Sequence, residues 1–195
     1  MKMDSRLILA LDETDGAKAL KVAESVSGIV DAIKINWPLV LSEGPGMITR
    51  LSELSEVVCD FKVADIPNTV RLIVENAVSR GASGVIVHAF TGDDSLRAAV
   101  EAAGGADIYA VTEMSHPGGK MFTALHAEEM ARLGVECGVS GFIAPATRPE
   151  RIAAIREVIG DLKILSPGVG AQGGKASDAI SAGADYVIVG RAIYG

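Results

Sequence analysis

Eight short, almost continuously apolar runs recur along the chain and constrain its fold more than any other feature. They are rich in β-branched residues and lack the polar–apolar alternation of a strand with one solvated face. Continuously apolar strands are typical of a parallel sheet that is buried on both faces. The runs cover residues 7–11, 32–35, 57–61, 85–87, 108–111, 142–144, 162–165 and 186–189.

Amphipathic segments separate the runs and carry helix start and stop signals. Glycines follow two of them, at Gly81 and Gly104, as is typical of helix C-termini. We expect Thr14 to cap the first helix and Pro38 to stand at the first turn of the second. The predicted helices span residues 15–26, 39–54, 68–80, 93–103, 121–137, 149–159 and 176–182.

Strands that alternate with helices at this spacing, about 26 residues per unit, form either an open doubly wound sheet or a closed barrel. The first run lacks the G-x-G-x-x-G segment of a dinucleotide-binding domain, because residues 12–15 read D-E-T-D. Gly-Ala pairs at 81–82 and 183–184 fit tight turns before barrel strands. We therefore predict an α/β fold, a single (β/α)8 TIM barrel over residues 1–195, with its last helix missing.

The composition excludes several classes of protein. Apolar residues make up 49% of the chain, which excludes a disordered protein, and a net charge of −7 provides no global field for nucleic acid. The apolar runs are too short to span a bilayer, and we expect the stretch after Met1 not to be a secretory signal, because Asp12 ends its apolar run. Cys59 and Cys137 are too few for a disulfide framework and lack metal-ligand spacing, which indicates a reducing, cytoplasmic compartment.

Polar residues cluster where the runs end. The active sites of this barrel fold lie at the C-terminal ends of its strands, so we expect these side chains to meet at one mouth. The charged and titratable residues at these ends are Asp12, Lys34, Asp60, Lys62, Asp65, His88, Glu113 and Arg191.

The third run is the most informative, because it places charges on a buried strand. Asp60 and Lys62 share a face by the strand period of two, and buried charges cost several kcal/mol each unless they are paired. One interpretation is a structural Asp60–Lys62 ion pair near Lys34. The other is a preorganised ammonium that stabilises a carbanion and delivers a proton to it. Convergence of the three residues at one mouth favours proton chemistry at carbon over hydrolysis.

Residues 166–174 follow the seventh run and contain four glycines. Loops after strands seven and eight of such barrels commonly bind phosphate through backbone N–H groups and a helix N-terminus. Arg191, after the eighth run, can add a charge-assisted hydrogen bond. A merely flexible turn is the alternative; we predict that the ligand is a phosphate ester.

Other candidates are weaker. We expect His88 to be a hydrogen-bonded structural histidine and Trp37 to be a packing residue or an interface anchor. No histidine spacing suits zinc. Lys34 and Lys62 disfavour a magnesium ion among the nearby carboxylates, so we predict no metal site. Those carboxylates are Asp12, Asp60, Asp65 and Glu113.

Residues 60–67 read D-F-K-V-A-D-I-P and, with Lys34 upstream, resemble the D-x-K-x-x-D-I-P motif of the orotidine 5′-phosphate decarboxylase family. Segments 112–118, 166–174 and 189–191 are also similar to that family, especially to its short archaeal-type branch. The resemblance runs from residue 6 to residue 194. D-x-K-x-x-D alone is shared with sugar-phosphate enzymes of the same superfamily. The segment 36–38, N-W-P, departs from the expected G-y-P.

The resemblance implies a cofactor-free (β/α)8 homodimer that converts orotidine 5′-monophosphate, a nucleotide, to uridine 5′-monophosphate and carbon dioxide in pyrimidine biosynthesis. It implies that Lys62 stabilises and protonates the C6 carbanion and that Asp60 lies near the substrate carboxylate. Lys34 would hold the charge array and touch the ribose together with Asp12. Asp65 would complete the array from the partner subunit.

The same resemblance assigns the remaining contacts. Thr69 would reach the partner's site with Asp65, and Ile66 would form part of the apolar pocket that receives the carboxylate. Ser115 would contact the pyrimidine, and Gln172 would bridge pyrimidine and phosphate. The other substrate-binding residues are Arg191, which grips the phosphate, and Pro167, Gly168, Val169, Gly170, Ala171 and Gly190.

Two other functions remain open from the sequence. One is a Mg²⁺-dependent sugar-phosphate decarboxylase or aldolase of the same superfamily, which a chelator would inhibit. The other is a nucleotide-binding barrel without catalysis, which would hold a uridine nucleotide and turn nothing over. Neither a nucleic acid nor a membrane is expected as a partner.

Overall fold

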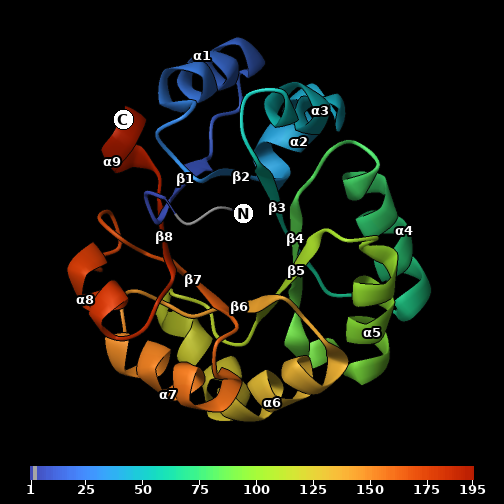
Figure 1. The fold of residues 1–195 in the computed structure, drawn as a ribbon, viewed down its shortest axis with the longest axis vertical. Coiled ribbons are helices and arrows are strands. Elements are labelled where there is room, and N and C mark those ends of the chain that lie inside the picture. The colour runs from blue at the N-terminus through green and yellow to red at the C-terminus, as the bar shows by residue number, and fades with distance from the viewer. Residues whose placement is uncertain (2–3) are drawn as a thin grey trace.

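A computed structural model describes residues 1 and 4–195 and contains a closed barrel of eight parallel strands (Figure 1). Each strand pairs with the next in the sequence, and β8 closes the ring by pairing with β1, Leu9 opposite Val189. The predicted (β/α)8 barrel is confirmed. The strands are β1 (Leu7–Leu11), β2 (Ala32–Asn36), β3 (Val57–Val63), β4 (Gly84–His88), β5 (Asp107–Val111), β6 (Gly141–Ile143), β7 (Lys163–Pro167) and β8 (Tyr186–Val189).

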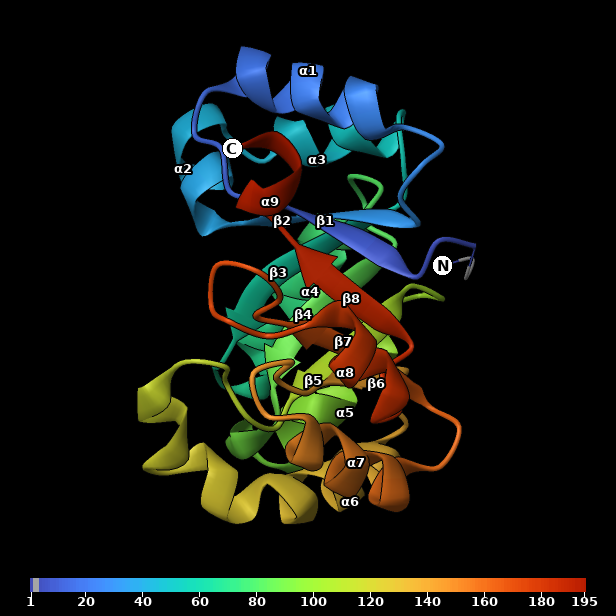
Figure 2. The ribbon, with the colours of Figure 1, turned by 90° about the vertical axis from the view of Figure 1, so that its left-hand side faces the viewer.

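Helices surround the strands on the outside of the barrel (Figures 1 and 2). Three short 3-10 helices interrupt the connections after β4 and β5: η1 (Ala89–Thr91), η2 (Pro117–Lys120) and η3 (Thr123–His126). The α-helices are α1 (Gly16–Val26), α2 (Trp37–Glu43), α3 (Gly46–Ser52), α4 (Pro67–Val78), α5 (Asp93–Ala102), α6 (Ala127–Cys137), α7 (Pro149–Ile159), α8 (Ala176–Ser181) and α9 (Arg191–Tyr194).

Three helix predictions are wrong in detail. The predicted helix over 39–54 is two helices, because Gly44 adopts a φ of 80° and Pro45 follows it. The predicted helix over 121–137 begins only at Ala127, after η3. Asp15 rather than Thr14 caps α1, since its side chain accepts a hydrogen bond from the Lys18 N–H at 2.9 Å.

The strands are buried on both faces, which explains their continuously apolar sequences. On β1, Ile8 belongs to the cluster of side chains inside the barrel, and Leu9 and Leu11 belong to the layer between strands and helices. This second layer is the larger core. The barrel interior is therefore packed rather than open, and polar side chains find room only at its ends.

One short helix follows β8. In both views α9 lies on the α1 side of the barrel (Figures 1 and 2), and the Tyr194 hydroxyl accepts a hydrogen bond from the Asp12 N–H at 3.0 Å. The sequence predicted that the helix after the eighth strand is missing. At this position the structure has α9, a helix of four residues. Within the described residues, no helix is both long enough and apolar enough to cross a membrane.

Candidate active site

A cavity of about 380 Å³ opens at the C-terminal ends of the strands. The structure brings most of the predicted site residues to its wall. They come from the ends of β1, β2, β3, β7 and β8 and from the connection after β5. The predicted residues that line it are Asp12, Lys34, Asp60, Lys62, Ser115, Pro167, Gly168, Val169, Ala171, Gln172, Gly190 and Arg191.

Asp60 joins two lysines at the wall of this cavity. Its carboxylate lies 3.0 Å from Lys34 Nζ and 2.8 Å from Lys62 Nζ. Lys34 and Asp60 are each only 8% exposed at their side chains, whereas Lys62 is 41% exposed. Burial raises the pKa of Asp60, but the two ammonium groups outweigh burial and hold the pKa below its ordinary value. Asp60 is therefore ionised at neutral pH.

The backbone of β3 is distorted at the lysine that faces the cavity. Lys62 has a φ of 43° and is one of two non-glycine residues with a positive φ in residues 1 and 4–195. The pairing of β3 with β4 shifts register between Cys59 and Val63. A left-handed conformation costs an L-residue on the order of 1–2 kcal/mol. Asp60 and Lys62 share a face as predicted, but Lys62 does so with a strained backbone conformation of its own.

His88 ends β4 and is 8% exposed. Its ring packs on Phe90, with 4.8 Å between ring centroids. The prediction of a hydrogen-bonded histidine is not met at Nδ1, which is buried and has no partner among the described residues. Burial and the nearby Lys62 charge lower the pKa of His88 to about 4, and Asp60 opposes this shift. The imidazole is therefore neutral at neutral pH.

The loop after β7 is shaped by its glycines. Gly168, Gly170 and Gly173 have φ values of 98°, 77° and 89°, a region that side chains other than glycine rarely adopt. The Gly174 N–H donates to the Gly168 carbonyl at 3.0 Å, which closes the loop on itself. Gly170 lies in this loop but is not among the residues that line the cavity.

The loop after β7 packs closely against Thr147 and against Ser115 in the connection after β5. A Cβ at Gly168 would lie 3.1 Å from Thr147 Cγ2 and 3.4 Å from both Gln172 Oε1 and Ser115 Cβ. Arg191 stands exposed at the start of α9 and lines the same space. No ion pair engages Arg191 within the part of the chain that the structure describes. Backbone amides and a guanidinium thus border one end of the cavity.

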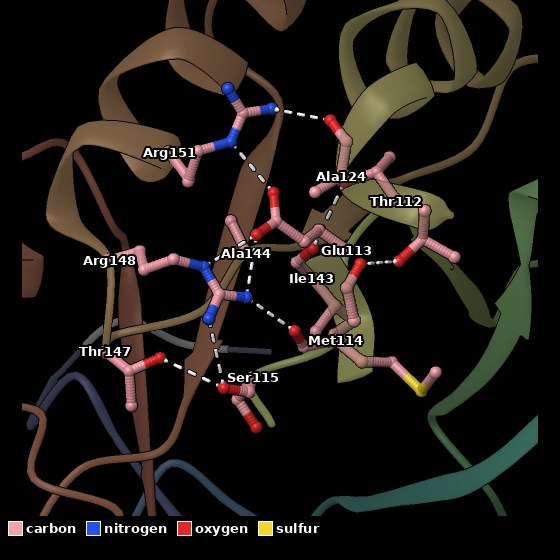
Figure 3. A network of polar contacts seen from close by, with 12 residues as sticks. Thr112, Glu113, Met114, Ser115, Ala124, Ile143, Ala144, Thr147, Arg148 and Arg151 are labelled. Carbon is pink, nitrogen blue, oxygen red and sulfur yellow. Dashed lines mark hydrogen bonds and ion pairs between the residues drawn. The ribbon is translucent and has the colours of Figure 1, made fainter. Parts of the chain in front are cut away.

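The connection after β5 carries Ser115 and is held by an arginine network (Figure 3). Glu113, 1% exposed, accepts hydrogen bonds from Arg148 Nε at 2.7 Å and from Arg151 Nε at 2.8 Å. Arg148 also donates to the carbonyls of Met114 at 2.6 Å and Ser115 at 3.2 Å. Both carboxylate oxygens of Glu113 are therefore engaged by guanidinium groups, and this network fixes the backbone that presents Ser115.

Besides Gly170, three further predicted residues do not line this cavity. Asp65, Ile66 and Thr69 belong to the connection between β3 and α4 and to the first turns of α4. Ile66 is 66% exposed and Asp65 is also exposed. Asp65 Oδ1 accepts a hydrogen bond from the Ile66 N–H at 2.8 Å. None of these three residues lines the chain's own cavity, and their assignment to a partner's site stays a prediction.

Sequence reasoning missed several lining residues. Asn36 follows β2 as Asp12 follows β1, and its Nδ2 donates to Asp12 Oδ1 at 2.7 Å. Its position at a strand end was a signal that could have found it. Met114, His116 and Ala192 also line the cavity. Within residues 1 and 4–195, no group of three or more His, Cys, Asp or Glu side chains could hold a metal ion.

Comparison with known proteins gives consistent matches over almost the whole chain. Residues 5–195 match the model of the orotidine 5′-phosphate decarboxylase / HUMPS family. The orotidine 5′-phosphate decarboxylase of Methanococcoides burtonii is 57% identical over 197 residues, covering 100% of this chain and 92% of the relative. That of Thermococcus kodakarensis is 51% identical over 195 residues, covering 98% and 90%.

Solved structures agree with the sequence matches. The orotidine 5′-monophosphate decarboxylase of Methanocaldococcus jannaschii, complexed with the inhibitor BMP, is similar with a TM-score of 0.91 and 45% identity, covering 96% of this chain and 90% of that one. The Pyrococcus horikoshii enzyme gives a TM-score of 0.89 and 49% identity over the same shares of 96% and 90%.

Proposed function

The chain belongs to the orotidine 5′-phosphate decarboxylase / HUMPS family, and from that premise we propose that it converts orotidine 5′-monophosphate to uridine 5′-monophosphate and carbon dioxide, a step of pyrimidine biosynthesis. The observation that carries the proposal is the Lys34–Asp60–Lys62 cluster on the wall of the cavity. The substrate class fits this cavity, which brings a glycine-rich loop and an ammonium group to one space.

Lys62 is the proposed proton donor. When the bond between C6 and the carboxylate breaks, carbon dioxide leaves and the electron pair stays on C6. The Lys62 ammonium stabilises this charge and then transfers a proton to C6, and the neutral amine regains its proton from water. The geometry supports this role because Lys62 is the most exposed of the three charged groups and lines the cavity.

Asp60 and Lys34 prepare the lysine for this step. Asp60 stays ionised because its pKa is held low by Lys34 and Lys62 against the opposing effect of burial. It fixes the Lys62 ammonium through two contacts, at 2.8 and 2.9 Å. We assign to Asp60 a place beside the substrate carboxylate. Lys34 and Asp12 are assigned to the ribose.

The phosphate and the base take the opposite wall. Backbone N–H groups of the loop over 168–174, together with Arg191, are assigned to the phosphate, since both border the cavity and offer donors. Ser115 and Gln172 are assigned to the pyrimidine and to the bridge between base and phosphate. Their proximity to Gly168 supports this pairing.

We also propose a homodimer in which Asp65 and Thr69 of each chain reach the cavity of the other. Both residues lie outside their own cavity, and Thr69 lines a second, outward-facing hollow of about 270 Å³. Two exposed apolar side chains line it, Trp37 and Leu72, at 41% and 51% exposure. An apolar outer surface of this kind favours an interface. A cytoplasmic location stays a prediction.

The proposed reaction is tested by following the loss of orotidine 5′-monophosphate absorbance with a metal chelator present. Turnover that resists the chelator is the expected result. Turnover only of a sugar phosphate, and only with added Mg²⁺, would place the chain with its sugar-phosphate relatives. Tight binding of uridine 5′-monophosphate without turnover would indicate a binding barrel.

A further inference from the structure

Trp37 lies outside the cavity but contacts the strand that carries its reactive lysine. It is the first residue of α2, directly after β2. Its indole Nε1 donates a hydrogen bond to the Phe61 carbonyl at 2.9 Å. The two rings are stacked, with 4.5 Å between centroids and 25° between planes. Trp37 therefore holds both the side chain and the backbone of the residue that precedes Lys62.

The Phe61 carbonyl, which accepts this hydrogen bond, lies where the pairing of β3 with its neighbours is interrupted. Pairing with β2 ends at Asp60, and pairing with β4 passes from Cys59 to Val63. Phe61 and Lys62 therefore appear in neither set of paired residues. The peptide that joins them is also the one whose orientation sets the φ of 43° at Lys62. An unpaired peptide next to a strained residue would relax unless another group fixed it.

We propose that Trp37 is a positioning residue for Lys62: its indole N–H and ring fix the Phe61–Lys62 peptide, and this keeps the lysine ammonium directed at the reacting carbon. The inference rests on the proposed function, in which Lys62 delivers the proton. It concerns a residue where this chain departs from the expected family pattern, at the N-W-P segment over 36–38.

Two contacts on either side make this arrangement effective. Asn36, the preceding residue, donates to Asp12 Oδ1 at 2.7 Å, so the segment after β2 is tied to β1 as well as to β3. On the other side of the strained residue, Lys62 Nζ is held by Asp60. The lysine thus has its side chain fixed at one end and its backbone at the other. Small displacements of a catalytic group cost large factors in rate.

The test removes the hydrogen bond while the ring stays. Trp37 is the only tryptophan in the chain, so site-specific replacement by benzothienylalanine, an isostere without the N–H, changes one hydrogen bond alone. Trp37→Phe is the genetically simpler companion. We expect kcat to fall roughly tenfold or more, with KM and the affinity for uridine 5′-monophosphate within about twofold of the parent. The ¹⁵N shift of the Lys62 ammonium should change in the same variants.

A merely structural or interfacial role would give different results. Trp37 also lines the outer hollow, so each variant is assayed over a range of protein concentrations while its oligomeric state is followed by sedimentation. A kcat unchanged in the isostere, or restored by raising the protein concentration, would overturn the inference while leaving the proposed reaction intact. A parent chain that does not turn over orotidine 5′-monophosphate would instead overturn the proposed function.

Discussion

The barrel carries a lysine–aspartate pair at each end, and the two pairs are chemically alike. At the base, where β5 and β7 begin, Lys163 Nζ lies 2.8 Å from Asp107 Oδ2. At the mouth, Lys62 Nζ lies 2.8 Å from Asp60 Oδ1. Burial raises the pKa of each aspartate, and in each case the neighbouring donors outweigh burial and lower it.

The two pairs differ in the number of lysine charges that contact the aspartate, and only the pair at the mouth lines the cavity. Asp107 accepts from Lys163 and from the Tyr109 hydroxyl at 2.7 Å, so one lysine charge meets one carboxylate. Asp60 meets the ammonium groups of both Lys34 and Lys62, so two lysine charges share one carboxylate at the wall of the cavity. On the proposed mechanism, the position of an ion pair along the strands and its charge balance distinguish the reactive pair at the mouth from the structural pair at the base.

The largest expected difference in kcat is between two single variants, Lys62→Ala at the mouth and Lys163→Ala at the base. Lys62→Ala should lower kcat by about 10²–10⁴, because the proposed proton donor is lost, and should leave the thermal unfolding temperature close to that of the parent. Lys163→Ala is the matched control at the base and should keep the parent kcat. Steady-state kinetics with calorimetry on both variants checks this. Equal losses of kcat in the two would remove the distinction.

Acid should lower the free energy of unfolding through protonation of His88. The folded-state pKa of this imidazole is about 4, below its ordinary value of 6.5, so the unfolded chain binds a proton that the folded chain excludes. Stability is therefore full above pH 6.5 and falls as the pH drops from 6.5 toward 4, by about 3 kcal/mol at most. Urea unfolding at pH 7 and at pH 4.5 measures this loss. In His88→Asn the loss of unfolding free energy between pH 7 and pH 4.5 should be smaller. An identical loss would refute the assignment of this pH dependence to His88.

Breaking the basal pair should cost stability rather than rate. Lys163→Met leaves Asp107 partly buried without its ammonium partner and should lower the free energy of unfolding by about 1–3 kcal/mol. Adding Asp107→Asn should recover part of this loss. Because the pKa of Asp107 is lowered, its contribution is present above its ordinary pKa and is lost as the pH falls through the folded value. A double variant no more stable than Lys163→Met would contradict this account.

The smallest effect is expected at the arginine network around Glu113. Arg151 donates to Glu113 at 2.8 Å and to Glu128 at 2.9 Å without lining the cavity. Arg151→Met should loosen the backbone that presents Ser115 and raise KM roughly two- to fivefold, with kcat little changed. Arg132→Met, on the neighbouring helix α6, is the control. Equal KM values in both variants would exclude a role for the network in binding.

The sequence predicted the barrel well because burial on both faces of a strand is written directly in its residues. The runs 7–11 and 186–189 coincide with β1 and β8. Helix boundaries were less accurate, although the break at Gly44 and Pro45 was visible in the sequence. The charged strand ends could be read in the same way, because the fold itself brings the C-terminal ends of its strands together.

Other features of the site had no local signal. The positive φ of Lys62 could not be predicted, since lysine has no preference for that region and the register shift of β3 depends on its neighbours. The arginines that engage Glu113 lie 35 and 38 residues further along the chain. Such contacts depend on how close the end of β5 lies to the start of α7 in the folded chain.

The central claim is that the mouth pair performs proton chemistry at C6 and that the basal pair only stabilises the fold. The reverse of product protonation tests it most directly: in D₂O the enzyme should exchange the C6 hydrogen of uridine 5′-monophosphate for deuterium, as NMR can follow. We predict exchange in the parent and in Lys163→Ala, and none in Lys62→Ala. Exchange that survives in Lys62→Ala would contradict the account.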